Sequence, residues 1–130
     1  MLREISRRKV RNVVWLTADV HYTAAHHYSP DRATVGGFDP FWEIRFRSTR
    51  AGAFGPNKLD PTFGPEAVFM HVPPAANTSP AGGFQHFGEV NVDGASGNLT
   101  VDLRDATGAS LRSKTLQPQR RWVPHLHSPR

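Results

Sequence analysis

The sequence contains no cysteine among its 130 residues. This absence excludes disulfide bonds, cysteine nucleophiles and thiolate metal ligands, and it does not identify a cellular compartment. No apolar run approaches the ~20 residues that a membrane-spanning helix needs, so we expect no transmembrane segment. The charged residues of segment 1–11 are not followed by an apolar stretch, so we predict no signal peptide there.

Glycine and proline are abundant, with 11 of each. Together they exceed the roughly 12% of average usage, which predicts many turns and long loops. Hydrophobic residues make up 38% of the chain and include eight Phe and three Trp. That content supports a modest core, and the length is that of one domain.

The net charge of +5 and the isoelectric point near 10.4 come from the two ends of the chain. Five basic residues and one acid give segment 1–11 a net charge of +4, and five basic residues without an acid give segment 112–130 a net charge of +5. Residues 12–111 between them carry a net charge of −4. A nucleic-acid groove places Lys and Arg on one folded face, whereas basic ends are typical of solvated tails. We therefore do not expect a nucleic-acid partner.

The first half of the chain has weak periodicity. Leu2, Ile5 and Val10 indicate a helix that ends near residues 11–12, and the apolar run 13–18 predicts a strand buried on both faces of a sheet. Residues 19–40 and 50–65 are predicted to be loops, because they are rich in Gly and Pro or lack a period. The segment 41–46 between them is compatible with a short helix or a strand.

The second half has clearer strand signals. Residues 67–72 predict a strand, and residues 74–83 a linker rich in Pro, Gly and Ser. Three further segments, 84–93, 99–103 and 110–116, are separated by short turns and predict an antiparallel meander with one buried face. The predicted fold class is therefore α+β, mostly β, ending in this meander. A basic tail, 119–130, is expected to be disordered.

Asp19 and His21 directly follow the apolar run 13–18. On extended backbone, residues i and i+2 point to the same face, and ligands of α/β sheets bind at the carboxyl ends of strands. A carboxylate and an imidazole there are candidate ligands for zinc, iron or manganese. Spacing alone favours the alternative, in which Asp19 caps a turn and His21 is a surface or packing histidine, because a metal site needs three or four ligands.

His26 and His27 extend this group of histidines. His26 is a candidate general acid or hydrogen-bond donor to a phosphoryl oxygen, but adjacent histidines do not easily point at one centre. His71 and His86 are expected to be structural. The sequence has no nucleophile-elbow serine, and the glycines of segment 52–55 are too close together for a phosphate-binding loop.

Five blocks of the sequence resemble, in order, the PhoD-like metallophosphatases (alkaline phosphatase D). The most specific block is RNVVWLTADVHYTAAH, residues 11–26, which resembles the C-terminal signature of that family. The others are residues 38–43, 51–57, 60–66 and 84–94. Five ordered blocks are more specific than any single motif in the chain.

The resemblance covers about residues 2–118 and implies the C-terminal portion of an α/β/β/α metallophosphoesterase sandwich. It implies that Asp19 and His21 are metal ligands, in a centre that hydrolyses phosphate esters with iron and calcium. His26 matches a nearby position and is our candidate catalytic residue. Members of the family are exported, periplasmic or extracellular proteins, but this chain gives no localisation of its own.

The sequence also departs from the family pattern. The family's earlier ligand blocks have no counterpart, and residues 45–51 differ from the usual sequence. Two ligands do not hold a binuclear centre, so we expect residues 1–118 to be a partial domain of a C-terminal fragment without activity on its own, which does not retain the metal ions. The alternative is a non-enzymatic, β-rich interaction module. In either case we expect self-association through the surface left by the missing half.

Overall fold

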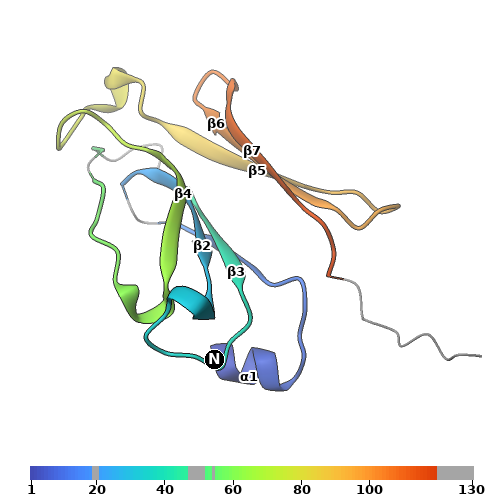
Figure 1. Cartoon of the computed structure of the whole chain (residues 1–130). Helices are drawn as coiled ribbons and strands as arrows, with labels where there is room; N and C mark the ends of the chain where they lie inside the picture. Colours follow the sequence, from blue (N-terminus) through green and yellow to red (C-terminus); the bar gives the residue numbers. More distant parts are fainter. Residues whose placement is uncertain (19–20, 47–51, 54, 120–130) are drawn as a thin grey trace, which may run out of the picture.

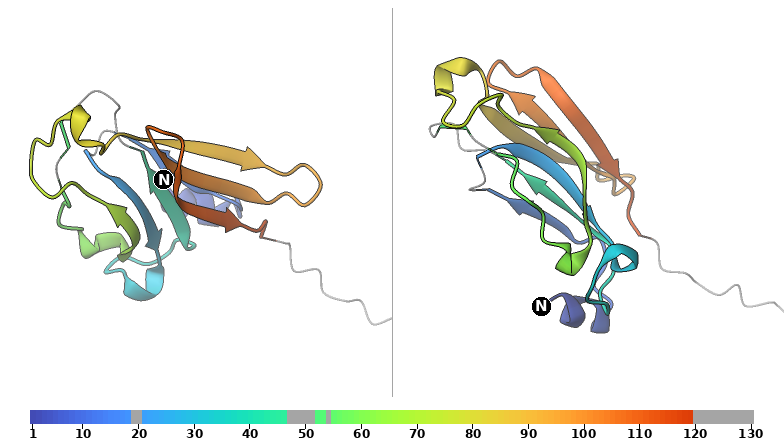
Figure 2. Two further views of the ribbon diagram at one scale, coloured as in Figure 1. Left: turned by 90° about the horizontal axis from the view of Figure 1, so that it is seen from above. Right: turned by 60° about the vertical axis from the view of Figure 1, so that its left-hand side comes forward.

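Two β-sheets that face each other hold most of the regular secondary structure (Figures 1 and 2). The computed structural model describes residues 1–18, 21–46, 52–53 and 55–119. In this part of the chain, the larger sheet has the strand order β1-β3-β2-β4 and the smaller sheet has the order β5-β6-β7. The strands span β1 Val14–Thr17, β2 Thr23–Tyr28, β3 Phe41–Arg45, β4 Pro65–His71, β5 His86–Val92, β6 Leu99–Asp105 and β7 Ser110–Leu116.

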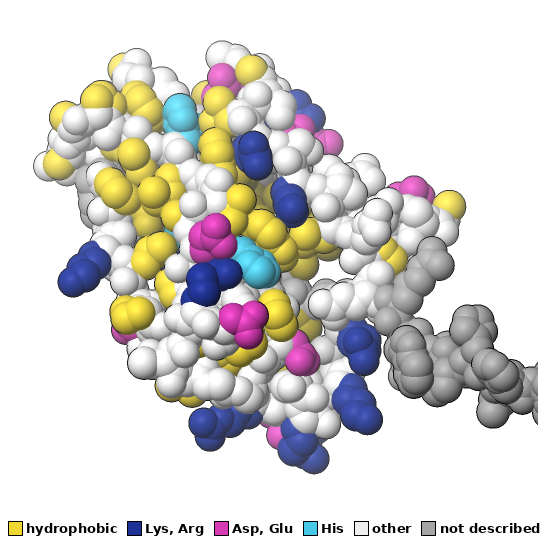
Figure 3. Space-filling view, viewed as in Figure 1, with side chains coloured by type: hydrophobic (Ala, Val, Ile, Leu, Met, Phe, Trp, Pro, Cys, Tyr) yellow, Lys and Arg dark blue, Asp and Glu magenta, His cyan; other side chains and the backbone are white. Residues whose placement is uncertain are grey.

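One short α-helix, α1 (Leu2–Arg7), precedes the larger sheet. The carboxylate of Glu4 pairs with the guanidinium groups of Arg7 and Arg8 one turn later, which supports this exposed turn. The helix ends earlier than expected, because Lys9 and Asn12 adopt left-handed φ angles of 54° and 59°. Basic side chains gather at this end of the molecule, at the bottom of Figure 3. No helix in the described part of the chain is both long and apolar enough to cross a membrane.

The prediction that residues 13–18 form a strand buried on both faces was wrong. Among the described strands, β1 lies at the edge of the sheet and pairs with β3 alone, in parallel. The Leu16 side chain is 50% exposed, although it belongs to the most apolar run of the sequence. The run predicts an interior strand because it is apolar and rich in β-branched residues, but within the described chain no strand lies on its other side.

The prediction of a loop over residues 19–40 was also wrong, because it contains the central strand β2. This strand pairs antiparallel with β3 on one side and β4 on the other. Thr23, Ala24, Ala25 and His26 are at most 4% exposed. A strand covered on both faces has no alternation of apolar and polar residues, and the small alanines make its hydrophobicity low, so sequence periodicity did not reveal it.

The remaining loops contain three short 3₁₀ helices, η1 (Pro30–Arg32), η2 (Pro61–Phe63) and η3 (Pro80–Gly82). Each begins with proline after a residue whose side chain accepts a hydrogen bond from the turn's backbone; these capping residues are Ser29, Asp60 and Ser79. The long segments between strands therefore have local structure of their own.

The meander is confirmed in its order and pairing, with β5 and β7 antiparallel to β6. Gly97 and Gly108 have φ angles of 73° and 89° in its two turns, a conformation that glycine adopts without steric cost. The core lies between the sheets, where Ala25 and Ile44 of the larger sheet pack with Val101 and Leu103 of the meander. The fold is therefore mostly β with a little helix, as predicted. Residues 120–130 of the predicted tail lie outside the described residues.

Candidate metal centre

The candidate metal ligands follow the carboxyl end of β1. Because β1 and β3 are parallel, with Thr17 in register with Arg45, their carboxyl ends lie at the same edge of the sheet. Asp19 lies outside the described residues. His21 is described and follows β1, as the sequence predicted, and it precedes β2, which the sequence did not predict.

His21 is held by a backbone carbonyl from a distant loop. Its Nδ1 lies 2.6 Å from the carbonyl oxygen of Gly52, and a carbonyl can only accept, so Nδ1–H is the donor. The next residue, Ala53, is fully buried and pairs with Thr78 through two backbone hydrogen bonds of 2.9 and 3.1 Å. This pairing fixes the loop that carries the Gly52 carbonyl, and through it the orientation of the His21 ring.

The tautomer of His21 fits a metal-binding role. Histidines that ligate metals typically donate the other ring N–H to a carbonyl or carboxylate, which directs the remaining nitrogen to the ion. With Nδ1 protonated, the neutral ring carries its lone pair on Nε2. Among the described residues, however, no group of three or more His, Asp or Glu side chains could hold a metal ion. The described part of the chain therefore offers one oriented ligand rather than a complete site.

The three neighbouring histidines do not share a centre. The imidazole of His27 lies against the Trp42 ring, with 4.9 Å between ring centroids, on the face of the sheet that meets the meander. His26 precedes it in the strand and points to the opposite face, as strand geometry requires. The expectation that adjacent histidines do not point at one centre is confirmed for His26 and His27.

His26 is fully buried at the centre of the larger sheet. It is 0% exposed, and neither ring nitrogen has a hydrogen-bond partner among the described residues. Burial lowers the pKa of His26, the guanidinium of Arg45 lowers it further, and the carboxylate of Glu43 opposes the shift in part. The ring is therefore neutral at neutral pH. Its catalytic role stays a prediction.

A polar network that the sequence analysis missed lies beside His26. Glu43 is in register with His26 and accepts hydrogen bonds from Thr17 Oγ1 (2.9 Å), Tyr28 Oη (2.6 Å) and Arg45 Nη2 (3.0 Å). These four residues come from β1, β2 and β3, so the network joins three strands on the face away from the meander. The signal that could have found it is the pair of charges two residues apart in the apolar segment 41–46.

Burial and hydrogen bonding oppose each other at Glu43. Burial alone would raise the pKa of this carboxyl, but hydrogen bonds from Arg45, Tyr28 and Thr17 outweigh it and hold the pKa below its usual value. For Tyr28 the two effects act together, because burial and the hydrogen bond to Glu43 raise its pKa to about 12. The carboxylate is therefore charged and the phenol neutral at neutral pH.

His71 and His86 lie among aromatic rings at the start of the meander. The His71 ring stacks on Phe84 at 5.1 Å and meets the buried His86 ring edge-on at 4.8 Å. His71 is the last residue of β4 and His86 is the first residue of β5, two strands that face the core. These positions agree with the structural role expected for both histidines.

A comparison with protein families identifies the chain. The model of the PhoD-like phosphatases matches residues 1–103. No curated protein and no solved structure matches the chain. Because the family match covers well over half of the 130 residues, this chain belongs to the PhoD-like phosphatase family.

Proposed function

We propose that Asp19 and His21 of this chain contribute to a metal centre that hydrolyses phosphate esters, with the iron and calcium implied by the resemblance. The observation that carries the proposal is the hydrogen bond from His21 Nδ1–H to the Gly52 carbonyl. It orients the ring and directs Nε2, rather than Nδ1, to the ion. Metal ions at such a centre act as Lewis acids on the phosphoryl group and lower the pKa of bound water.

The proposal assigns separate tasks to the residues of this chain. Asp19 would supply a carboxylate oxygen and His21 the Nε2 nitrogen. His26, which is neutral because of its burial, offers one N–H donor and one lone pair. This state favours hydrogen-bond donation to a phosphoryl oxygen over proton transfer from an imidazolium.

The tautomer of His21 gives a direct test that does not depend on activity. The ring nitrogen shifts of His21, measured by NMR at a pH where the ring is neutral, should show a proton on Nδ1. Exposed histidines usually carry it on Nε2, so a neutral His21 protonated on Nε2 would remove the support for this proposal. His27 is a suitable comparison within the same chain, because its Nδ1 lies 3.3 Å from Arg32 Nη2 and therefore accepts.

We further propose that the 130-residue chain is inactive on its own. A metal ion in a protein site needs three or four ligands, and only Asp19 and His21 are assigned here. The experiment is a phosphatase assay of the purified chain with p-nitrophenyl phosphate and bis-p-nitrophenyl phosphate, with added iron and calcium. We expect no turnover above the metal-only control. Metal-dependent turnover that His21→Ala abolishes would contradict the inactivity and support the metal site.

The second candidate function is a non-enzymatic interaction module. One observation favours it: apolar side chains of β1 and of β5 are exposed, and in the described chain each of these strands lies at an edge of its sheet. If the chain is an interaction module, its binding should change neither with added metal ions nor with the His21→Ala substitution. The phosphatase function, in contrast, needs both the metal ions and His21.

A further inference from the structure

The linker 74–83 reaches the loop that holds His21. Thr78 and Ala53 form an isolated antiparallel bridge, in which the Ala53 N–H donates to the Thr78 carbonyl at 2.9 Å and the Thr78 N–H donates to the Ala53 carbonyl at 3.1 Å. Gly52, whose carbonyl accepts the hydrogen bond from His21 Nδ1–H, lies directly before Ala53. Three segments that are far apart in the sequence therefore meet at this ring.

The same loop also packs against the residue that follows His21. Gly55 has a φ angle of 139°, which favours glycine, and a Cβ added there would lie 2.5 Å from Cδ1 of the Tyr22 ring. Both Tyr22, at 1%, and Ala53, at 0%, are almost completely buried. The loop therefore touches His21 and Tyr22 with two of its glycines, and between these glycines it is paired with Thr78.

Thr78 is itself held by its own side chain. Its hydroxyl group donates to the Ala75 carbonyl at 2.6 Å, within the linker. A Cβ added to Gly82, the last residue of η3, would lie 2.8 Å from the Thr78 methyl carbon Cγ2, so this glycine leaves the methyl group its space. The turn η3 is capped by the side chain of Ser79, which accepts from the Ala81 N–H. The linker is therefore locally ordered around Thr78.

We propose that Thr78 is a positioning residue for His21, and that it acts through Ala53 and the Gly52 carbonyl. This inference rests on the proposed function, in which His21 binds a metal ion through Nε2. Groups that orient a ligating histidine through its other ring N–H typically contribute 10–100-fold to metal affinity. Here the orienting group is a backbone carbonyl, so its position depends on the pairing of the backbone next to it, which Thr78 provides.

The test perturbs Thr78 without changing any residue that touches His21. Gly82 has no left-handed φ angle, so alanine fits its backbone, and Gly82→Ala should push on the Thr78 methyl group and weaken the bridge to Ala53. Adding Thr78→Ser removes that methyl group and keeps the hydroxyl, so the double variant should restore the bridge. Gly94→Ala is the matched control, because no atom lies within 4 Å of its added Cβ.

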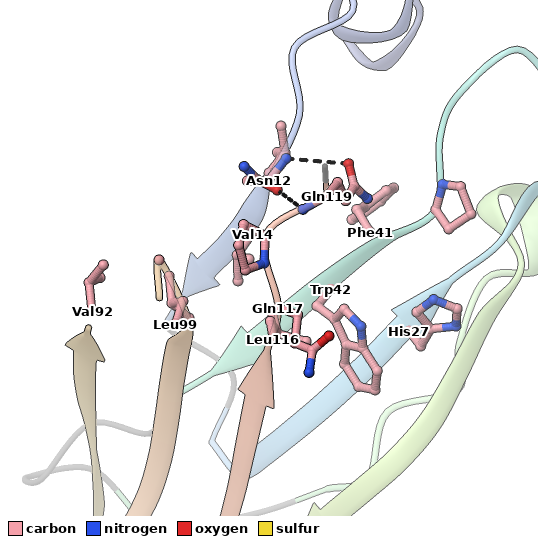
Figure 4. A pocket seen from close by; sticks show the side chains of 14 residues that line it. Asn12, Val14, His27, Phe41, Trp42, Val92, Leu99, Leu116, Gln117 and Gln119 are labelled. Carbon is pink, nitrogen blue, oxygen red and sulfur yellow. Dashed lines mark hydrogen bonds between the residues drawn. The ribbon is translucent and has the colours of Figure 1, made fainter. Parts of the chain in front are cut away.

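Two NMR measurements on the full chain follow the effect. Hydrogen exchange of the Ala53 N–H reports the bridge and should be faster in Gly82→Ala. The ring nitrogen shifts of neutral His21 report its tautomer, and the ratio of the two tautomers should move about tenfold toward Nε2–H, as expected for one weakened hydrogen bond. His27 lines the cleft between the sheets beside Trp42 (Figure 4), and its ring shifts should not change unless the whole fold is disturbed.

The outcomes distinguish this inference from the proposed function. Faster exchange at Ala53 with an unchanged His21 tautomer overturns the positioning role and leaves the proposed function standing. If Gly82→Ala does not change the exchange at Ala53, Thr78→Pro decides, because proline lacks the N–H that bonds to Ala53. An unchanged His21 tautomer in Thr78→Pro, with His27 signals as in the unsubstituted chain, overturns the role. A proton on Nε2 of neutral His21 in the unsubstituted chain contradicts the proposed function as well.

Discussion

The strands β1 and β2 flank the same strand, β3, yet one is an exposed edge and the other is enclosed on both faces. The edge strand is built from large apolar residues, VWLT, whereas the enclosed strand is TAAHHY. The larger and more hydrophobic residues are therefore on β1, the strand whose faces are less covered. The difference teaches that the cover over each face, rather than the residues of the strand itself, determines how deeply it is buried.

The cover over β2 comes from several parts of the chain. On the inner face, Ala25 packs in the core cluster with Val101 and Leu103 of the meander. On the outer face, the Tyr28 ring stacks on Phe41 with 4.6 Å between centroids. The small Ala25 side chain allows the meander to approach β2 closely.

The strand β1 is only partly covered on its two faces. Val14 packs at the border of the core, and the Trp15 ring contacts Phe41 at 6.3 Å between centroids. Leu16 points to the same face as Val14, but the meander does not cover it. A stability measurement should therefore respond very differently to the same substitution in the two strands.

The largest expected effect comes from placing a charge in each strand. Ala25→Asp buries an unpaired carboxylate in the core and should destabilise the fold by about 4 kcal/mol or more, enough to unfold a marginal domain. Leu16→Asp, at a half-exposed position, should cost less than about 1 kcal/mol. Urea unfolding of both variants measures the difference. Similar losses for the two variants would show that β1 and β2 are equally buried in solution.

The second-largest expected loss of stability concerns the contact between Gly88 of the meander and Phe46, which follows β3 of the larger sheet. A Cβ on Gly88 would lie 1.7 Å from the ring of Phe46, so this glycine gives the ring its space. Gly88→Ala should displace the ring and cost about 2–3 kcal/mol. Gly94→Ala in the β5–β6 turn is the control, because no atom lies within 4 Å of its added Cβ. Urea midpoints that fall equally for both variants would contradict the contact.

The sequence predicted the strands whose surroundings match their own pattern. Leu99, Val101 and Leu103 alternate with polar residues because one face of β6 meets the core and the other meets solvent. Alternation in one segment then reports its burial, and turn glycines mark its ends, so the meander was predicted correctly.

The sequence did not predict what depends on distant segments. The burial of β2 is produced by β3, β4 and the meander, none of which is encoded in TAAHHY. The same holds for the site: the position of His21 after β1 follows from the motif, but its contact with Gly52 depends on a loop 31 residues away. The Glu43 network was missed because its members are brought together only by the register of three strands.

That network links the two compared strands and should make the stability depend on pH. The pKa of Glu43 is lower in the fold than in the unfolded chain, so its contribution is complete above the ordinary value of about 4.3 and is lost as the pH falls through the folded value. Glu43→Gln should cost about 2 kcal/mol at neutral pH, and less as the pH falls. Urea unfolding at several pH values measures this. Glu66→Gln is the control, because this side chain is 57% exposed and its pairing with Arg32 is solvated.

The smallest expected loss of stability compares what β1 and β2 each contribute to the Glu43 network. Tyr28 on β2 donates to Glu43 at 2.6 Å, and Thr17 on β1 donates at 2.9 Å. Tyr28→Phe keeps the ring stack on Phe41 and should cost about 1 kcal/mol, whereas Thr17→Val keeps the shape of the edge residue and should cost about half as much. The reason is that the Tyr28 phenol is desolvated, as its pKa of about 12 reflects, while the edge position lets water replace the Thr17 hydroxyl. Equal losses in urea unfolding, or a larger loss for Thr17→Val, would mean that the outer face of β1 is as dry as that of β2 and that the edge is covered in solution.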